Sequence, residues 1–313
     1  MLSTVQSKQL SSTLKLGLAF ISISLLTHCT HIGSNLNKPQ THIGSQEAQI
    51  AKERAHAEKA FQKGEDYYYG EHGIKDIDAA TFWYRSAAEQ GHMHAQFAMG
   101  VINYAGKTIN YEEAFHWFSQ AAAQGHAESQ SNLGIMYFYG FGVDDDNEKA
   151  VEWFSKAANQ NFGNAQYNLG LMYELGEGVK TDLAQAVHWY ELAANNEVTM
   201  AQNDLGGFYA EGRGVAQNNE RALFWYRKAA KAGDERALFN LGMAFLNGTL
   251  VEANSRMAVH LLQQSAKRGY RKAQDQLAKL EESLLQPNPL IGYYIEQDEF
   301  WLEEEQEKEP YGP

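Results

Sequence analysis

The sequence predicts an all-α fold, a right-handed solenoid of about six tandem helix-turn-helix repeats. Two series of residues predict it. Tryptophans recur 34 to 36 residues apart, each followed four residues later by an alanine pair, and Leu-Gly or Met-Gly pairs recur with the same period. Self-similarity at a fixed period is typical of repeat proteins, in which each unit buries its apolar face against its neighbours.

The tryptophans lie in the second half of each unit, where a large ring can fill the gap between adjacent repeats while small alanines allow the helices to approach closely. We therefore assign the tryptophans to the structural core of the repeats and not to a binding site. They are Trp83, Trp117, Trp153, Trp189 and Trp225.

The fourth repeat shows most fully how a unit is built. In its first helix, Ala165, Leu169 and Tyr173 are spaced four residues apart and form one apolar stripe of helical period. Gly176 follows at a helix end that favours the left-handed conformation. Thr181–Asp182 then supplies side-chain oxygens that can cap a second helix.

Residues 165–194 show the pattern Ala-x-x-x-Leu-Gly-x-x-Tyr-x-x-Gly-x-Gly-Val, followed by Ala-x-x-Trp-x-x-x-Ala-Ala. This pattern resembles the Sel1-like repeat family, a relative of the tetratricopeptide repeats, and the resemblance covers about residues 55–280. The end units depart from it; in the first, Lys63-Gly64 stands where Leu-Gly is expected. Degenerate end units suit capping roles.

The resemblance implies a scaffold for protein–protein interaction that binds a peptide or protein partner, with no enzymatic activity and no cofactor. Bacterial members of the family are often exported and take part in envelope assembly, host contact or signalling. The alternative is a cell-wall-ligand or β-lactam-type binding protein or hydrolase on the same solenoid, because one branch was reported to bind or hydrolyse β-lactams. That branch is rich in cysteine pairs, whereas Cys29 is the single cysteine here.

In the family geometry, the first helix of each repeat lines a concave groove, and the positions that flank Leu-Gly point into it. A mostly apolar groove suits an extended peptide or a partner helix. The same side chains can instead pack between repeats, and both interpretations stay open for each residue. The candidate groove residues are His94, Phe97, Val101, Tyr104, Ser131, Ile135, Phe138, Tyr139, Asn164, Tyr167, Leu171, Glu174, Asn203, Arg236, Phe239 and Met243.

A polar residue recurs directly before the leucine of several units, as in Asn132, Asn168 and Asn240. Such a side chain can bond the backbone of a bound peptide, or it can bond neighbouring groups between repeats. The second role is the commoner one for a polar residue that recurs in every unit, so we favour it.

The first 29 residues indicate export. Lys8 and Lys15 precede the apolar run 16–26, which is short for a membrane span and has the order of a signal peptide. The run looks like a bacterial lipoprotein signal, in which Cys29 becomes the lipidated N-terminus, although His28 stands where a small residue is usual. We expect a lipid anchor at the outer membrane or in the periplasm. The alternatives are an uncleaved anchor and an ordinary signal peptide that releases a periplasmic or secreted soluble protein.

Four segments are therefore expected. A signal peptide covers residues 1–29, and a polar, flexible linker with little apolar surface covers residues 30–50. The repeat solenoid covers residues 51–285 and ends in a capping helix, and residues 286–313 form an acidic tail that contains aromatic residues. The tail is either disordered or docks its aromatics on a partner or on the last repeats.

Charge and motifs argue against other classes of function. The net charge of −13 opposes a nucleic-acid partner, which needs a basic surface. His92, His94 and His126 lie near the starts of first helices, but the repeat explains them, and no His-Glu-x-x-His spacing occurs, so no metal site is expected. The sequence also contains no nucleophile motif and no phosphate-binding loop.

Overall fold

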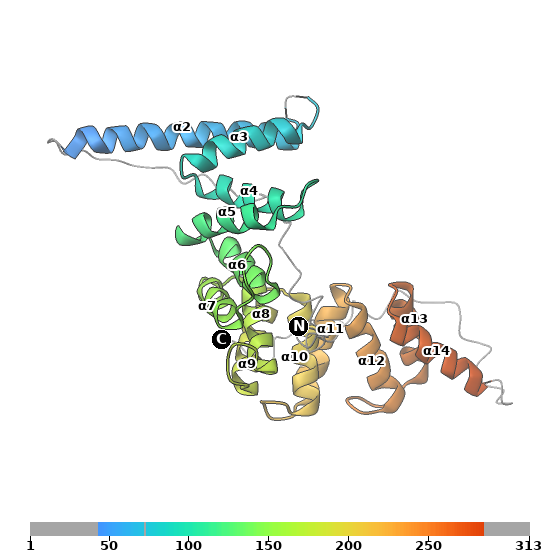
Figure 1. Ribbon diagram of the computed structural model, residues 1–313. Coiled ribbons are helices and arrows are strands. Elements are labelled where there is room, and N and C mark those ends of the chain that lie inside the picture. Colours follow the sequence, from blue (N-terminus) through green and yellow to red (C-terminus); the bar gives the residue numbers. More distant parts are fainter. Residues whose placement is uncertain (1–42, 72, 285–313) are drawn as a thin grey trace, which may run out of the picture. The chain divides into compact units, whose positions relative to one another are not determined.

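The computed structural model describes residues 43–71 and 73–284, and within these ranges the chain forms thirteen helices and no strand (Figure 1). The predicted all-α solenoid of tandem helix-turn-helix repeats is confirmed. The signal peptide with Cys29 and the tail 286–313 lie outside the described residues. The helices are α2 (Ile43–Tyr69), α3 (Ile77–Glu89), α4 (Met93–Ala105), α5 (Tyr111–Ala123), α6 (Ala127–Tyr139), α7 (Asn147–Ala158), α8 (Gly163–Leu175), α9 (Leu183–Asn195), α10 (Thr199–Glu211), α11 (Asn219–Lys231), α12 (Glu235–Asn247), α13 (Ser255–Lys267) and α14 (Arg271–Leu284).

The chain divides into two compact units after Asp182, and α2–α8 belong to unit 1 while α9–α14 belong to unit 2. Within each unit, consecutive helices pack against each other. The even-numbered helices from α2 to α12 are the first helices of the repeats, and the odd-numbered helices are the second. The last helix, α14, is the capping helix expected at the end of the solenoid.

The local sequence explains where the helices begin and end. Several second helices follow an Asp or Asn whose side chain accepts a hydrogen bond from a backbone N–H three residues on, as Asp146 does from Lys149. Four first helices end at a glycine in the left-handed conformation, including the predicted Gly176 with φ 73°. At two ends where a glycine is replaced, Asn161 and Glu197 adopt positive φ instead. These caps fix the length of each repeat.

The two helices of a repeat come closest at the glycine of the Leu-Gly pair. A Cβ atom added at Gly134 on α6 would lie 2.5 Å from the ring of Phe154 on α7. Real Cβ atoms do not approach that closely, so the ring occupies the space that the missing side chain leaves. Gly64 makes the same contact with Tyr84, and the first repeat therefore keeps the packing although Lys63 replaces the leucine.

The ring at this contact belongs to the residue after a tryptophan, namely Tyr84, Phe118, Phe154 or Tyr226. These four rings are buried, as is Tyr190 after Trp189. The prediction that the tryptophans form the core is correct for Trp117, which is 4% exposed, but the other four are only half-buried and flank the core. In α11, for example, Ala222, Tyr226 and Ala229 lie on one buried face, whereas Trp225 is turned about 100° away from Tyr226.

A recurring buried glutamine, which the sequence analysis did not single out, joins successive helices. Gln96 Nε2 donates to the Ala88 carbonyl at 3.1 Å, and Gln130 Nε2 donates to the Ala122 carbonyl at 3.2 Å. The accepting carbonyls lie in the last turn of a second helix, where carbonyl groups lack partners within the helix. The signal was present in the sequence, because glutamine recurs with the repeat period at positions 96, 130, 166, 202 and 274.

One predicted boundary is wrong. Residues 43–50, expected in the flexible linker, form the start of α2. Strong helix formers such as Glu47, Ala48 and Gln49 extend the helix although they bury no apolar surface.

Gly206 and Gly207 on α10 offer a matched test of the close approach. A Cβ atom at Gly206 would lie 2.7 Å from the Tyr226 ring, whereas one at Gly207 would lie 3.5 Å from the Tyr226 hydroxyl, which is an ordinary contact. Both changes to alanine gain helix propensity. Gly207→Ala should therefore stabilise the protein by roughly 0.5–1 kcal/mol, and Gly206→Ala should destabilise it by about 1–3 kcal/mol. Urea unfolding measures both, and two shifts of the same sign would contradict the packing.

Candidate binding groove

The predicted groove residues of unit 1 are largely packed. Phe97, for example, lies with its ring centroid 4.7 Å from that of His126 in the next repeat, so neighbouring repeats cover these positions. The groove interpretation is therefore wrong for the buried ones, which belong to the core. The buried candidates of unit 1 are Phe97, Val101, Ser131, Ile135, Phe138, Tyr167 and Leu171. His94, Tyr104, Tyr139, Asn164 and Glu174 are half-buried.

Three buried polar atoms on α6 and α8 have no hydrogen-bond partner among the described residues: Asn132 Nδ2, Tyr139 Oη and Asn168 Oδ1. Each of these atoms is almost wholly shielded from solvent. A ligand therefore cannot reach them while the helices keep these positions.

His92, His94 and His126 form a ladder with Phe61 and Phe97 at the starts of α4 and α6. The ring centroids of Phe61 and His92 are 4.4 Å apart, and those of His94 and His126 are 5.3 Å apart. His126 caps α6, because its Nδ1 accepts a hydrogen bond from the Ser129 backbone N–H at 3.2 Å. The ladder is thus a structural part of unit 1, and no group of three His, Cys, Asp or Glu side chains in the described part of the chain is placed to hold a metal ion.

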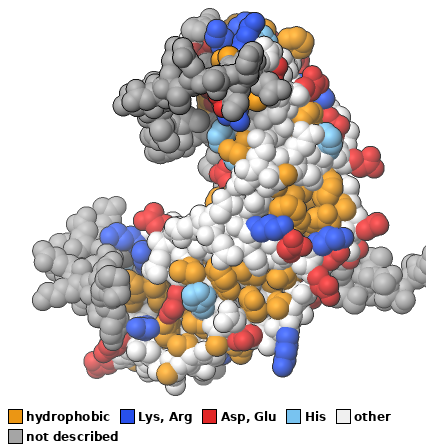
Figure 2. Space-filling model, turned by 90° about the vertical axis from the view of Figure 1, so that its left-hand side faces the viewer, with side chains coloured by type: hydrophobic (Ala, Val, Ile, Leu, Met, Phe, Trp, Pro, Cys, Tyr) orange, Lys and Arg blue, Asp and Glu red, His pale blue; other side chains and the backbone are white. Residues whose placement is uncertain are grey.

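The first helices of unit 2 also leave some side chains partly accessible. Phe239 and Met243 on α12 are half-buried, and a hollow of about 250 Å³ lies beside Met243. Ala210 and Glu211 at the end of α10 line the hollow, together with Leu250 in the loop after α12. Figure 2 shows hydrophobic side chains gathered in patches with charged residues at their edges.

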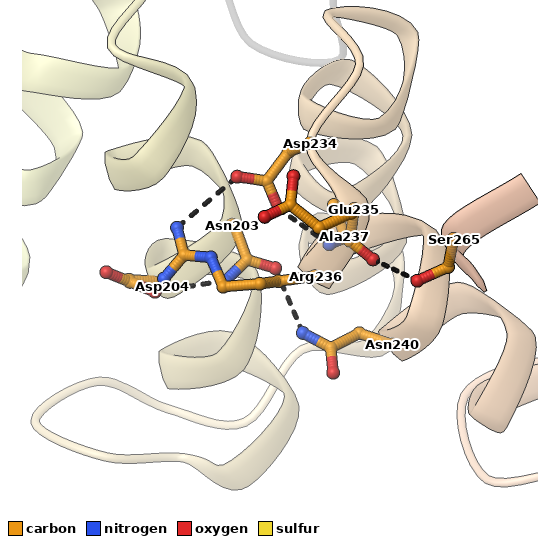
Figure 3. Close-up of polar contacts among 8 residues, drawn as sticks. All are labelled: Asn203, Asp204, Asp234, Glu235, Arg236, Ala237, Asn240 and Ser265. Carbon is orange, nitrogen blue, oxygen red and sulfur yellow. Dashed lines mark hydrogen bonds and ion pairs between the residues drawn. The ribbon is translucent and has the colours of Figure 1, made fainter. Parts of the chain in front are cut away.

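A polar network joins α10 to α12 next to this hollow (Figure 3). Arg236 forms ion pairs at 3.3 Å with both Asp204 and Asp234. Asp234 also caps α12 by accepting a hydrogen bond from the Ala237 N–H at 2.8 Å. Arg236, which was predicted to lie in the groove, is therefore held by two carboxylates. Its ion pair with Asp204 joins the sixth repeat to the fifth.

The network also involves Asn203 and Asn240. Asn203 is buried, which corrects its assignment to the groove surface, and its Nδ2 donates to Asp204 Oδ1 at 3.0 Å. Its Oδ1 accepts from Asn240 Nδ2 at 2.9 Å. Asn240 therefore has the role between repeats that we favoured, while its side chain also lines the hollow.

Another hollow, beside the exposed first half of α2, is lined mainly by Gln49, Lys52, Glu53, His56 and Lys59 of that one helix. Gln90 at the end of α3 also lines it, and every residue that lines it is exposed. The hollow between α10 and α12 is therefore the stronger candidate for a binding site.

No helix in the described ranges is long and apolar enough to cross a membrane.

The described chain is an α-helical repeat protein with a hollow between α10 and α12 in unit 2, and comparison with known proteins identifies its family. The family model for the Sel1 repeat matches residues 64–92, 94–126, 127–162, 163–198, 199–234 and 235–270. The chain therefore belongs to the Sel1-repeat family. Proteins of this family generally act as scaffolds that bind protein partners, and they are typically not enzymes.

Solved structures agree with this assignment. A protective antigen present in uropathogenic Escherichia coli strains is 32% identical, with a TM-score of 0.68, over 79% of this chain and 53% of that protein. This chain thus spans about half the length of that antigen. A Sel1 repeat protein from Oxalobacter formigenes is 31% identical, with a TM-score of 0.65, over 76% of this chain and 70% of that protein. The comparison with curated proteins finds no match.

The histidine cap predicts a pH-dependent stability. Burial, and secondly the neighbouring His94, lower the pKa of His126 to about 4 from 6.5. Glu128 Oε2 lies 3.7 Å from His126 Nε2, but burial raises the pKa of that carboxyl group. Because the unfolded chain binds the proton more tightly than the folded chain does, stability is complete above pH 6.5 and falls as the pH drops toward 4.

At pH 5.5 the loss from His126 should be about 1.4 kcal/mol relative to pH 7.5. His126→Asn keeps a capping side chain without the titration, so its urea midpoint should fall less between these pH values than that of the unmodified protein. His188→Asn, at an exposed position on α9, is the control and should behave like the unmodified protein. Equal pH dependence in all three proteins would contradict the assigned cap.

Proposed function

We propose that this protein is an interaction scaffold that binds an extended segment of a partner protein along α10 and α12. The observation that carries the proposal is the hollow beside half-buried Met243, where apolar side chains lie next to amide groups. Phe239 is half-buried one helical turn before Met243 on α12. Such a surface suits a peptide, because apolar pockets provide affinity and polar groups fix its direction. The alternative of a cell-wall-ligand or β-lactam-type binder or hydrolase has no comparable observation in its favour among the described residues.

Photocrosslinking and substitution test this groove. A crosslinking amino acid at position 239 should capture a partner, whose affinity for the purified protein is then measured by calorimetry. Met243→Glu places a charge in the groove and should weaken binding at least about tenfold. Gln263→Glu adds the same group at an exposed position on α13 and should change the affinity less than about twofold. Equal affinities for the two variants, each folded by circular dichroism, would contradict binding in the groove.

We also propose that the protein is exported and lipidated at Cys29, which would hold it at the bacterial envelope. The supporting observation is the order of charged and apolar residues before Leu26-Thr27-His28-Cys29. A lipid anchor tethers a folded domain to a membrane without a spanning helix.

The mass of the protein extracted from bacterial membranes tests the anchor. The mature chain should lack residues 1–28 and carry the added mass of a lipid on Cys29, and Cys29→Ala should abolish this product. A chain that retains residues 1–28, or one cleaved elsewhere without added mass, would contradict lipidation.

A further inference from the structure

The hydrogen bonds of the network determine which polar atom Asn240 presents to the hollow. The Asp204 carboxylate can only accept, so Asn203 must turn its Nδ2 toward it. The Oδ1 of Asn203 then accepts from Asn240 Nδ2, so the network uses one N–H of the Asn240 amide and leaves its Oδ1 as the acceptor. Figure 3 shows this oxygen turned away from Asn203. Asn240 therefore offers an acceptor to the hollow.

Tyr226 contributes a second polar atom, which its surroundings leave accessible. A side chain on the residue after the Leu-Gly glycine can cover the ring of the same repeat. In the first repeat, the residue at that position is Glu65, which accepts a hydrogen bond from the Tyr84 hydroxyl. In the fifth repeat it is Gly207, and no hydrogen bond to the Tyr226 hydroxyl occurs within the described residues.

The electrostatics of the hollow favour a positive charge. Burial, followed by the nearby Glu211 and Asp204 carboxylates, raises the pKa of Tyr226. The same carboxylates that oppose a phenolate would stabilise a cation at this place. Glu211 is 65% exposed and forms a long ion pair with Arg213, whose Nε lies 3.9 Å from its Oε2, so its carboxylate has room for a second cation.

Ligands of other charge fit this site less well. An anionic group would have to compete with Asp204 and Asp234 for Arg236, and it would meet Glu211. Apolar walls from Ala210, Met243 and Leu250 suit the methylene chain of a long side chain.

We propose that the hollow between α10 and α12 binds one basic side chain, Lys or Arg, of the partner segment. The methylene chain lies against Met243 and Leu250, and the cationic group donates hydrogen bonds to Glu211, Asn240 Oδ1 and the Tyr226 hydroxyl. The inference rests on the proposed function, since it assigns one specific contact to the peptide that the groove binds. Hydrogen bonds to charged groups are stronger than those between neutral groups, so this contact would set the register of the peptide.

A library of random ten-residue peptides displayed on phage, selected on the full chain, tests the proposal. Selected peptides should share Lys or Arg at one position. For a fluorescent copy of one such peptide, replacing that residue by glutamine should weaken binding about tenfold in an anisotropy titration. The same replacement should weaken binding to Glu211→Gln less than about twofold, because the carboxylate that recognises the charge is gone.

A second variant tests the hydroxyl without disturbing the fold. The pair Gly207→Val with Tyr226→Phe reproduces Val101 and Phe118 of the second repeat, a combination that this chain already packs. It should weaken the preference for a basic residue, but less than Glu211→Gln does because the carboxylate remains, with an unchanged circular dichroism spectrum. An unchanged preference would contradict the hydrogen bond to the Tyr226 hydroxyl.

Peptides without a shared basic residue, or an equal effect of the glutamine replacement on the unmodified protein and on Glu211→Gln, would overturn the basic-side-chain proposal. If those peptides still lose affinity for Met243→Glu and keep it for Gln263→Glu, the proposed groove function stands. A selection that yields no peptide dependent on Met243 would overturn both.

Discussion

The close contact between a glycine on the first helix and an aromatic or aliphatic side chain on the second sets the geometry of each repeat. The ring of Phe154 lies where a side chain at Gly134 would be, and Leu262 takes the same place against Gly242 in the last repeat. Buried alanines beside the ring allow the helices to approach, and buried glutamines such as Gln130 join the first helices α4, α6, α8 and α10 to the helix before each of them. Since this contact involves no exposed group, it can repeat unchanged while the outer positions vary.

In four of the repeats, the residue after the glycine is matched to the ring that packs against that glycine. Val101 and Ile135 are apolar and buried, and the rings in their repeats are phenylalanines. Where the ring is tyrosine, its hydroxyl needs polar surroundings. Glu65 provides them for Tyr84, whereas Gly207 leaves the Tyr226 hydroxyl facing the hollow. One small residue therefore leaves a polar atom accessible in the fifth repeat.

The sequence alone predicts the repeats well, because period, caps and small residues are local signals. It predicts less well which of two adjacent aromatics is buried. Trp225 and Tyr226 have the same period, but Tyr226 lies four residues after Ala222 and three before Ala229, on the face that those alanines define. The groove could be predicted only in part, since the exposure of Phe97 or Met243 depends on side chains from neighbouring repeats. The orientation of Asn240 depends on a network that involves two repeats, so no single-repeat pattern contains it.

Polar residues serve two purposes in the two units. In unit 1, the buried side chain of His126 caps α6. A proton on its Nδ1 would displace the hydrogen bond that this nitrogen accepts from the Ser129 backbone N–H. In unit 2, Asp234 has the equivalent position, and its charge is compatible with both the helix N-terminus and Arg236. Asp234 and Asp204 together hold Arg236, and Asp204 orients Asn203 and through it Asn240. The ion pairs between repeats thus fix the direction of an amide at the edge of the hollow. A network that stabilises the stack can in this way also prepare a hydrogen-bonding surface, because its last amide keeps an acceptor oxygen that the network does not use.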